Sequence, residues 1–106
     1  EERTKLLLLS PFLIEKGRTL EEKLNVLLQQ GYSRILVDGD VQRIDEANLP
    51  KKPKDLFLVV DRIITKNDED YLNRLADSIQ TSFYEGKGEL FIEELDTNKR
   101  YHFSNK

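Results

Sequence analysis

Two arginines flank a predicted hairpin turn, at positions from which a guanidinium group can bind a carboxylate. Arg34 and Arg43 lie on the two sides of Asp38-Gly39, a dipeptide that tolerates the positive φ angles of a two-residue turn. Such a turn pairs Arg34 directly with Arg43. Like charges at opposite positions are unfavourable by roughly 0.2 to 1 kcal/mol. The pair therefore predicts either an acidic side chain of the chain itself or a carboxylate supplied by a partner.

A third arginine, Arg62, follows the apolar run Leu56 to Val60 and Asp61. Simple strand alternation places Arg62 on the same face as Leu58 and Val60. A planar guanidinium group can bind a carboxylate through two parallel hydrogen bonds. Arg62 is therefore predicted either to pair with an acidic neighbour in the fold or to present its guanidinium group to a partner, and the sequence leaves both interpretations open.

The other groups with catalytic or ligand-binding chemistry have simpler structural interpretations. Gly86-Lys87-Gly88 lacks the glycine spacing and the hydroxyl residue of a phosphate-binding loop, which favours an ordinary turn. His102 is the only histidine and the chain has no cysteine, so His102 is expected to be an ordinary strand residue rather than a metal ligand. The carboxylates of Asp68 to Asp70 come at a predicted helix N-terminus, where negative charge offsets the helix dipole. An enzyme would require such carboxylates, or Glu93-Glu94, to converge with His102 in one pocket. We predict a binding domain without catalytic residues, metal or cofactor.

A nucleic-acid-binding module is the alternative function that the basic residues suggest. Lys51, Lys52 and Lys54 form a concentrated basic segment, and this Lys51 to Lys54 loop could contact phosphate groups together with nearby arginines. The formal net charge of -3 argues against it, because nucleic-acid binders usually carry a basic excess concentrated on one face. A charged exposed loop is more often simply solvated.

Hydrophobic periodicity predicts the elements that position these residues. Strands are expected at Lys5 to Leu9, closed by Ser10-Pro11, and at 35–37, 41–44, 56–65, 90–95 and 101–103. The strand 56–65 is apolar on both faces and is expected to be central. A helix is expected from Leu20 to Gln30 because Thr19 and Glu22 have the spacing of a capping box.

A second helix, with Asn67 as its cap and Leu72, Leu75, Ile79 and Phe83 on one face, is expected to end before Gly86. The segment Asp45 to Asp55 has no periodicity and is predicted to be a loop. Together these elements predict an α+β fold, in which two helices pack on a mostly antiparallel β-sheet in a single small domain.

Length and composition agree with one small domain. The 106 residues, 38% hydrophobic and 35% charged, can form one modest core beneath a heavily charged surface. No apolar run approaches the roughly 20 residues needed to span a bilayer, and Glu1 to Thr4 lacks the apolar stretch of a signal peptide. The absence of cysteine permits a reducing compartment. A cytoplasmic location is therefore expected.

Several short segments resemble one bacterial DNA-repair family in their order and spacing. They are Gln30 to Arg34, Val37 to Val41, Val59 to Arg62, Lys16-Gly17, Arg74 to Ser78 with Thr81, and Gly88 to Leu90. Over nearly its whole length the chain resembles the UvrB-binding domain of UvrA, a component of the bacterial excinuclease ABC. It departs from the family at Lys54-Asp55, where the family usually has a histidine, and at Asp40, where glutamate is frequent.

The resemblance implies a UvrB-interaction domain, residues 1–106, inserted in the first ATPase half of a much larger protein that acts in nucleotide excision repair. It implies that Arg34 and Arg62 contact UvrB, and Arg43 is a further candidate. ATP, zinc and DNA binding would belong to the rest of the parent protein, which would be dimeric, whereas the isolated domain is expected to be monomeric. An inserted domain leaves and rejoins its host, so Glu1 and Lys106 are expected on the same side of the fold.

Overall fold

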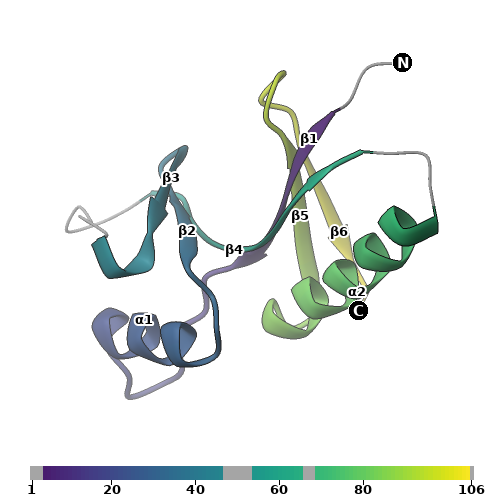
Figure 1. The fold of residues 1–106 in the computed structure, drawn as a ribbon. Coiled ribbons are helices and arrows are strands. Elements are labelled where there is room, and N and C mark those ends of the chain that lie inside the picture. The colour runs from purple at the N-terminus through teal and green to yellow at the C-terminus, as the bar shows by residue number, and fades with distance from the viewer. Residues whose placement is uncertain (1–3, 47–53, 66–68, 106) are drawn as a thin grey trace.

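The computed structural model confirms the predicted α+β architecture (Figure 1). The structure describes residues 4–46, 54–65 and 69–105. Among these residues the chain forms a six-stranded antiparallel sheet with the strand order β3-β2-β4-β1-β5-β6. The strands are β1 (Lys5–Pro11), β2 (Arg34–Val37), β3 (Asp40–Arg43), β4 (Leu56–Ile64), β5 (Glu89–Glu94) and β6 (Arg100–Ser104). The helices are α1 (Leu20–Gln29), α2 (Glu69–Glu85) and the short 3-10 helix η1 (Ile44–Glu46).

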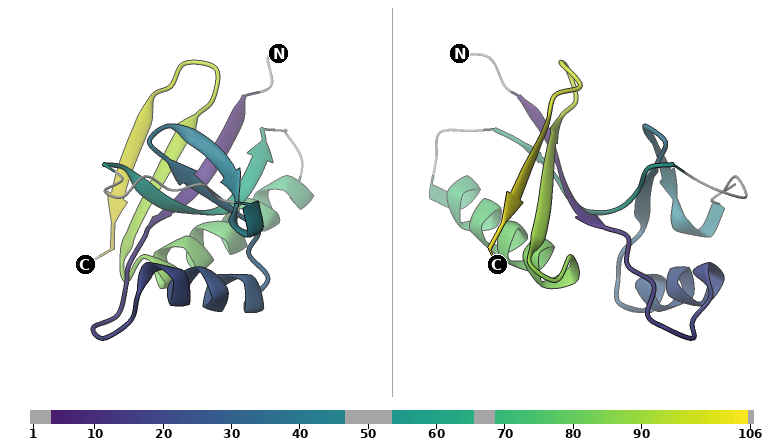
Figure 2. Two further views of the ribbon diagram at one scale, coloured as in Figure 1. Left: turned by 90° about the vertical axis from the view of Figure 1, so that its left-hand side faces the viewer. Right: turned by 180° about the vertical axis from the view of Figure 1, so that it is seen from behind.

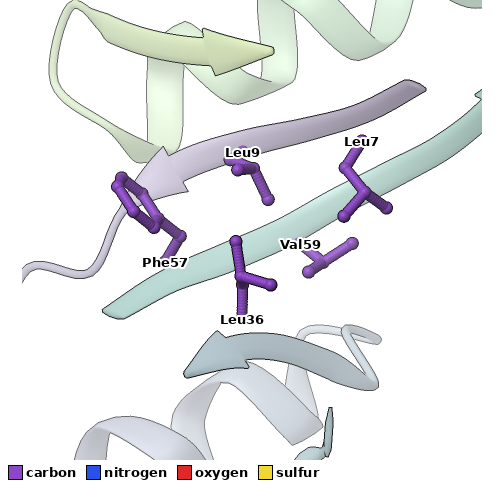
Figure 3. Packing of buried hydrophobic residues seen from close by; sticks show 5 residues of the cluster. All are labelled: Leu7, Leu9, Leu36, Phe57 and Val59. Carbon is purple, nitrogen blue, oxygen red and sulfur yellow. The ribbon is translucent and has the colours of Figure 1, made fainter. Parts of the chain in front are cut away.

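Both α-helices lie on one face of a strongly bent sheet, and the β2–β3 and β5–β6 hairpins turn toward the other face (Figures 1 and 2). We call these the helix face and the open face. Alternating strand residues supply a separate apolar cluster to each face. The helix-face cluster comprises Leu27 of α1 with Ile35, Val37, Ile44 and Leu58. The open-face cluster comprises Leu7, Leu9, Leu36, Phe57 and Val59 (Figure 3).

The capping box predicted for the first helix is present. The Thr19 hydroxyl accepts a hydrogen bond from the Glu22 backbone N–H at 3.1 Å, and the Glu22 carboxylate accepts one from the Thr19 N–H at 2.8 Å. These two bonds satisfy backbone groups that the helix itself leaves unpaired. The helix ends at Gln29, and Gly31 follows with a φ of 99°. Buried Leu27 then fixes the face that α1 packs on the sheet.

The second helix is also confirmed, from Glu69 to Glu85, and it ends immediately before Gly86. The predicted cap, Asn67, lies outside the described residues. Glu69 and Asp70 occupy the first turn, where their charge offsets the helix dipole. After the helix, Lys87 adopts a φ of 53° in a turn that leads into β5, so Gly86-Lys87-Gly88 is the ordinary turn that was predicted.

The predicted hairpin at Asp38-Gly39 forms with the expected register. Asp38 has a φ of 48° and Gly39 a φ of 91°, as a two-residue turn of this kind requires. Val37 pairs with Asp40, Leu36 with Val41, and Arg34 with Arg43. The Asp38 carboxylate also accepts hydrogen bonds from the backbone N–H groups of Lys54 and Asp55, at 2.9 and 2.7 Å. These bonds tie the turn to the start of β4.

Strand β4 is central, as predicted, and it contains a β-bulge. Leu9 of β1 lies opposite Val59, but Leu8 lies opposite Asp61, so Val60 is an extra residue on β4. Val60 packs against the helix-face cluster. The next residue, Asp61, accepts a hydrogen bond from Ser78 of α2, on the same face. Two consecutive residues therefore point to the helix face.

The bulge overturns the prediction that Arg62 shares a face with Leu58 and Val60. Strict alternation holds only for an uninterrupted strand, and one inserted residue moves every later side chain to the opposite face. Arg62 instead lies opposite Leu7, a member of the open-face cluster. Arg62 is therefore on the open face of the sheet.

Strand β1 is longer than predicted, because it continues through Ser10 and Pro11. Ser10 is fully buried, and its hydroxyl donates a 2.6 Å hydrogen bond to the backbone carbonyl of Ser82 in α2. A satisfied hydroxyl carries little penalty on burial. Ser10 is thus part of the strand, although the sequence pattern predicted that the strand would end at Leu9.

The expected proximity of the chain ends is not seen in the described residues. Glu1 and Lys106 themselves lie outside them. Strand β1 runs antiparallel to β5, and β5 runs antiparallel to β6. Thr4, at the start of β1, and Asn105, after β6, therefore lie at opposite ends of these strands.

Candidate partner-binding site

Arg34 and Arg62 line the same groove, although they come from different strands. The groove has a volume of about 390 Å³ and lies between Gly31–Arg34 and Val59–Arg62, with Arg74 of α2 completing its lining. It forms because β2 pairs with β4 only from Ile35 to Val37. Beyond that point β4 continues without β2 beside it.

The local structure explains why both arginines reach this groove. Arg34 is the first residue of β2, two positions before Leu36 of the open-face cluster, so alternation places it on the open face. The bulge places Arg62 on the same face. Both residues are exposed. Neither side chain makes a hydrogen bond or an ion pair with any residue in 4–46, 54–65 or 69–105.

Arg43 behaves differently from its cross-strand neighbour. Its Nε and Nη2 atoms donate to the two carboxylate oxygens of Asp45, at 3.2 and 3.1 Å. The hydrogen bonds and charge of Asp45 raise the pKa of Arg43. The predicted intramolecular acid thus exists for Arg43. This residue also lies outside the lining of the groove.

A second network borders the groove and was missed by sequence reasoning. Oδ1 of Asp61 accepts hydrogen bonds from the Arg62 backbone N–H at 2.8 Å and from Nη2 of Arg74 at 2.7 Å. Its Oδ2 accepts from Nε of Arg74 at 3.1 Å and from the Ser78 hydroxyl at 2.6 Å. Nη2 of Arg74 also donates to the Arg62 carbonyl at 3.2 Å. We call Asp61, Arg74 and Ser78 the clamp.

The clamp is electrostatically compensated, whereas the groove arginines are not. Partial burial acts to raise the pKa of Asp61, but hydrogen bonds from Arg74, Ser78 and the Arg62 amide hold it below its ordinary value. The guanidinium group of Arg74 is therefore already bound by the Asp61 carboxylate. The resembling segments Val59 to Arg62 and Arg74 to Ser78 each supply members of this network, which is the sequence signal that could have revealed it.

Arg100, which the sequence analysis did not single out, and His102 both make contacts within the described chain. Arg100 bonds to Glu93 and to Asp55 at 2.9 Å each, and its guanidinium carbon lies 4.7 Å from the centre of the Phe57 ring. His102 stacks on Phe91 and lies 2.5 Å from a carboxylate oxygen of Glu89. It is the ordinary strand histidine that was expected.

Three further observations limit the chemistry of the described residues. The described residues contain no cluster of three or more histidine, cysteine or carboxylate groups that could hold a metal ion. The α-helices in this part of the chain are too short or too polar to cross a membrane. Lys51 and Lys52 of the predicted basic loop lie outside the described residues, and Lys54 contacts Asp38 through its backbone.

The groove thus presents two exposed guanidinium groups without a partner among the described residues, held by two strands a short distance from a compensated acid–base network. Guanidinium groups in this state bind planar oxyanions such as carboxylates in a bidentate manner. Lining by backbone and arginine side chains supplies hydrogen-bond donors and positive charge. The arrangement suits an acidic group of a partner molecule.

Comparisons with known proteins identify the family of this chain. A family model described as "UvrA interaction domain" matches residues 1–96. UvrABC system protein A of Helicobacter pylori is 36% identical over 109 residues, which cover 98% of this chain and 11% of the relative. The proteins of the same name from Malacoplasma penetrans and Staphylococcus aureus are 33% and 31% identical, covering 98% and 91% of this chain. The chain spans only 11% and 10% of the length of these two relatives. The match of the family model to residues 1–96 and the identity to these relatives show that the chain belongs to the UvrA interaction domain family.

Proposed function

We propose that this chain is the domain through which UvrA recruits UvrB during bacterial nucleotide excision repair, with Arg34 and Arg62 as direct contacts. The observation that carries the proposal is their arrangement. Two exposed guanidinium groups, unpaired within the described part of the chain, line one groove. The family to which the chain belongs is itself described as an interaction domain.

The physical case rests on what unpaired arginines do at a protein surface. Arginine is enriched in interfaces because its fork binds carboxylates with defined geometry while its stem covers apolar surface. A partner carboxylate in the groove would find two donors already in place. Such an interface associates rapidly and weakens as the salt concentration rises.

Arg43 is proposed as a weaker contact than Arg34 or Arg62. Its guanidinium group already binds Asp45 through two hydrogen bonds. A partner carboxylate would have to share or displace Asp45. Arg34 and Arg62, which have no side-chain partner among the described residues, are therefore proposed to contribute more to binding than Arg43.

The remaining functions of the parent protein are proposed to lie outside this chain. The sequence has no cysteine and no phosphate-loop motif, so zinc and ATP binding are assigned to other parts of UvrA. DNA contact is likewise assigned to the rest of the protein. The domain is proposed to be non-catalytic and to act in the cytoplasm.

The test is a calorimetric titration of the domain with UvrB from the same source. The variant carrying Arg34→Glu and Arg62→Glu is expected to lose at least a hundredfold in affinity, since reversing charges opposite a buried carboxylate costs several kcal/mol. The double variant Arg18→Glu and Lys99→Glu is the matched control, because it makes the same total charge change at exposed sites outside the groove. The control is expected to bind like the parent, and circular dichroism checks that all variants are folded.

Two results would contradict the proposal. Equal losses of affinity for the groove variant and for the charge-matched double control would mean that only the net charge matters. A parent domain that fails to bind UvrB, but shifts a DNA fragment in a steeply salt-dependent manner, would favour the nucleic-acid-binding alternative.

A further inference from the structure

Along the edge of β4 that borders the groove, backbone groups are not paired with the neighbouring strand β2, whose pairing with β4 covers only Ile35 to Val37. Thr65 donates a hydrogen bond to the carbonyl of Thr4 at 2.9 Å, which marks a hydrogen-bonded pair between the extensions of β4 and β1. Hydrogen-bonded and non-hydrogen-bonded pairs alternate along antiparallel strands. The Leu7–Arg62 pair, three positions further on, is therefore non-hydrogen-bonded. The N–H and C=O groups of Arg62 accordingly point away from β1, toward the edge that β2 leaves open.

The clamp satisfies both of these backbone groups. The Asp61 carboxylate accepts from the Arg62 N–H, and Arg74 donates to the Arg62 carbonyl. Asp61 in turn is held to α2 by two bonds from Arg74 and one from Ser78. Its side chain is 18% exposed, so these bonds form in a partly dehydrated setting. Arg62 is thus fixed through its own backbone by side chains of α2.

The orientation of Asp61 links the clamp to the bulge. Asp61 reaches α2 only because it points to the helix face, in the same direction as the preceding residue, Val60. If the strand slipped by one residue to remove the bulge, Asp61 would turn to the open face and leave Arg74 and Ser78. Arg62 would then turn to the helix face, away from Arg34.

We propose that Asp61, anchored by Arg74 and Ser78, is the positioning residue that locks the bulge and thereby keeps Arg62 on the groove beside Arg34. This inference rests on the proposed docking function for its biological meaning. Asp61 and Arg74 need not touch the partner. Their role is to set the register of β4 and the orientation of the residue that does.

A purely structural role for the clamp is the competing explanation. In that case the network would only attach α2 to the sheet, and its loss would lower stability without changing the register at Arg62. Stability alone cannot separate the two roles. Two measurements are therefore needed. One determines the register of β4 against β1 in the free domain, and the other determines whether the effects of Asp61 and Arg62 on partner affinity depend on each other.

The first measurement uses NMR on the free 106-residue chain. In the parent, the α-protons of Leu7 and Arg62 should give a strong cross-strand NOE, because a non-hydrogen-bonded pair brings them close. Asp61→Ala is expected to weaken this NOE and to speed hydrogen exchange of the Arg62 amide roughly tenfold relative to the Leu58 amide. Arg74→Lys keeps the positive charge but loses the planar guanidinium group. This variant replaces Asp61→Ala in the experiment if Asp61→Ala does not fold. An unchanged NOE and unchanged relative exchange in the folded variant would overturn the proposal.

The second measurement is a double-mutant cycle on UvrB affinity. Asp61→Ala is expected to weaken binding roughly tenfold in the parent and to have almost no effect when Arg62 is already alanine, because Asp61 acts through Arg62. Equal losses in the two backgrounds would overturn the positioning role. If the parent chain does not bind UvrB at all, the docking function fails, and the NOE and exchange data alone decide whether Asp61 locks the bulge.

Discussion

Arg34 lies directly opposite Arg43 across the β2–β3 hairpin, but only Arg43 is bound by a carboxylate of the described chain, that of Asp45. The two guanidinium groups are thus chemically unequal despite their equivalent positions. Asp45 follows immediately after Ile44, which anchors η1 in the helix-face cluster. The hairpin therefore compensates one of its two arginines and leaves the other available.

Removing Arg34 should not destabilise the domain. Arg34→Ala relieves a like-charge cross-strand pair and is expected to raise the free energy of unfolding by a few tenths of a kcal/mol. Arg43→Ala also relieves the pair but loses the bonds to Asp45, so it should show no such gain. Urea unfolding of both variants checks the difference, preferably at low salt, where the repulsion is least screened. A clear loss of stability in Arg34→Ala would indicate an intramolecular partner for Arg34.

The stability of the domain should depend on the ionisation of Asp61. Its pKa in the folded state lies below its ordinary value, which is about 3.9 in an unfolded chain. The carboxylate therefore contributes stability that is fully present above the unfolded pKa and is lost as the pH falls through the lowered folded pKa. Asp61→Asn should be less stable than the parent by about 2 kcal/mol at pH 7.

The same variant supplies the check on this pH dependence. The difference in unfolding free energy between parent and Asp61→Asn is expected to narrow steadily as the pH is lowered below about 4. Chemical unfolding from pH 7 down to the acid limit of the folded state measures it. A difference that stays constant over this range would mean that the loss arises from packing, not from the charge.

The open-face cluster should carry much of the core energy. Leu9 is fully buried between β4 and β5 (Figure 3). Leu9→Ala is expected to lower the free energy of unfolding by about 2 to 5 kcal/mol, through lost burial and the cavity left behind. Leu72→Ala is the matched control, because Leu72 is 59% exposed on α2, and its effect should stay within about 0.5 kcal/mol. Denaturant unfolding of the pair measures both.

The turn between β2 and β3 should tolerate asparagine better than alanine. Gly39 adopts a φ of 91°, a conformation that costs an alanine roughly 1 to 2 kcal/mol and that asparagine adopts more readily. Gly39→Ala should therefore destabilise the domain more than Gly39→Asn, as measured by thermal unfolding. Because the turn sets the register of Arg34, Gly39→Ala should also weaken UvrB binding. Similar stabilities for the two variants would show that the turn relaxes to another type.

The sequence predicted best what is decided locally. The capping box of Thr19 and Glu22 and the Asp38-Gly39 turn depend on residues that are close in the chain, and both formed as expected. The bulge at Val60 could not be foreseen in this way. The residue after the bulge, Asp61, is bound by Arg74 and Ser78, which come from a later helix and reach Asp61 only in the folded domain.

The sequence analysis named the arginines of the candidate site but not their arrangement in space. Arg34 was selected because the hairpin pairs it with the like charge of Arg43, and Arg62 because it extends an apolar strand; the family resemblance implied that both contact the partner. Their meeting in one groove depends on β2 pairing with β4 and on how soon that pairing stops. Neither property is encoded in the periodicity of a single strand. The pairing of Arg43 with Asp45 is more local, because the two residues are two positions apart in the sequence, and it was therefore easier to predict.

The strand order also has a consequence for the time course of folding. The β2–β3 and β5–β6 hairpins join neighbouring segments of the chain, whereas β1 must pair with β4 and β5, which come much later in sequence. Contacts between distant segments form more slowly than local ones. The two hairpins are thus expected to form early and the central β1–β4 pair late. Since the bulge belongs to that central pair, Arg34 would take up its place in the hairpin first, and the domain would become competent to bind only in the last step of folding.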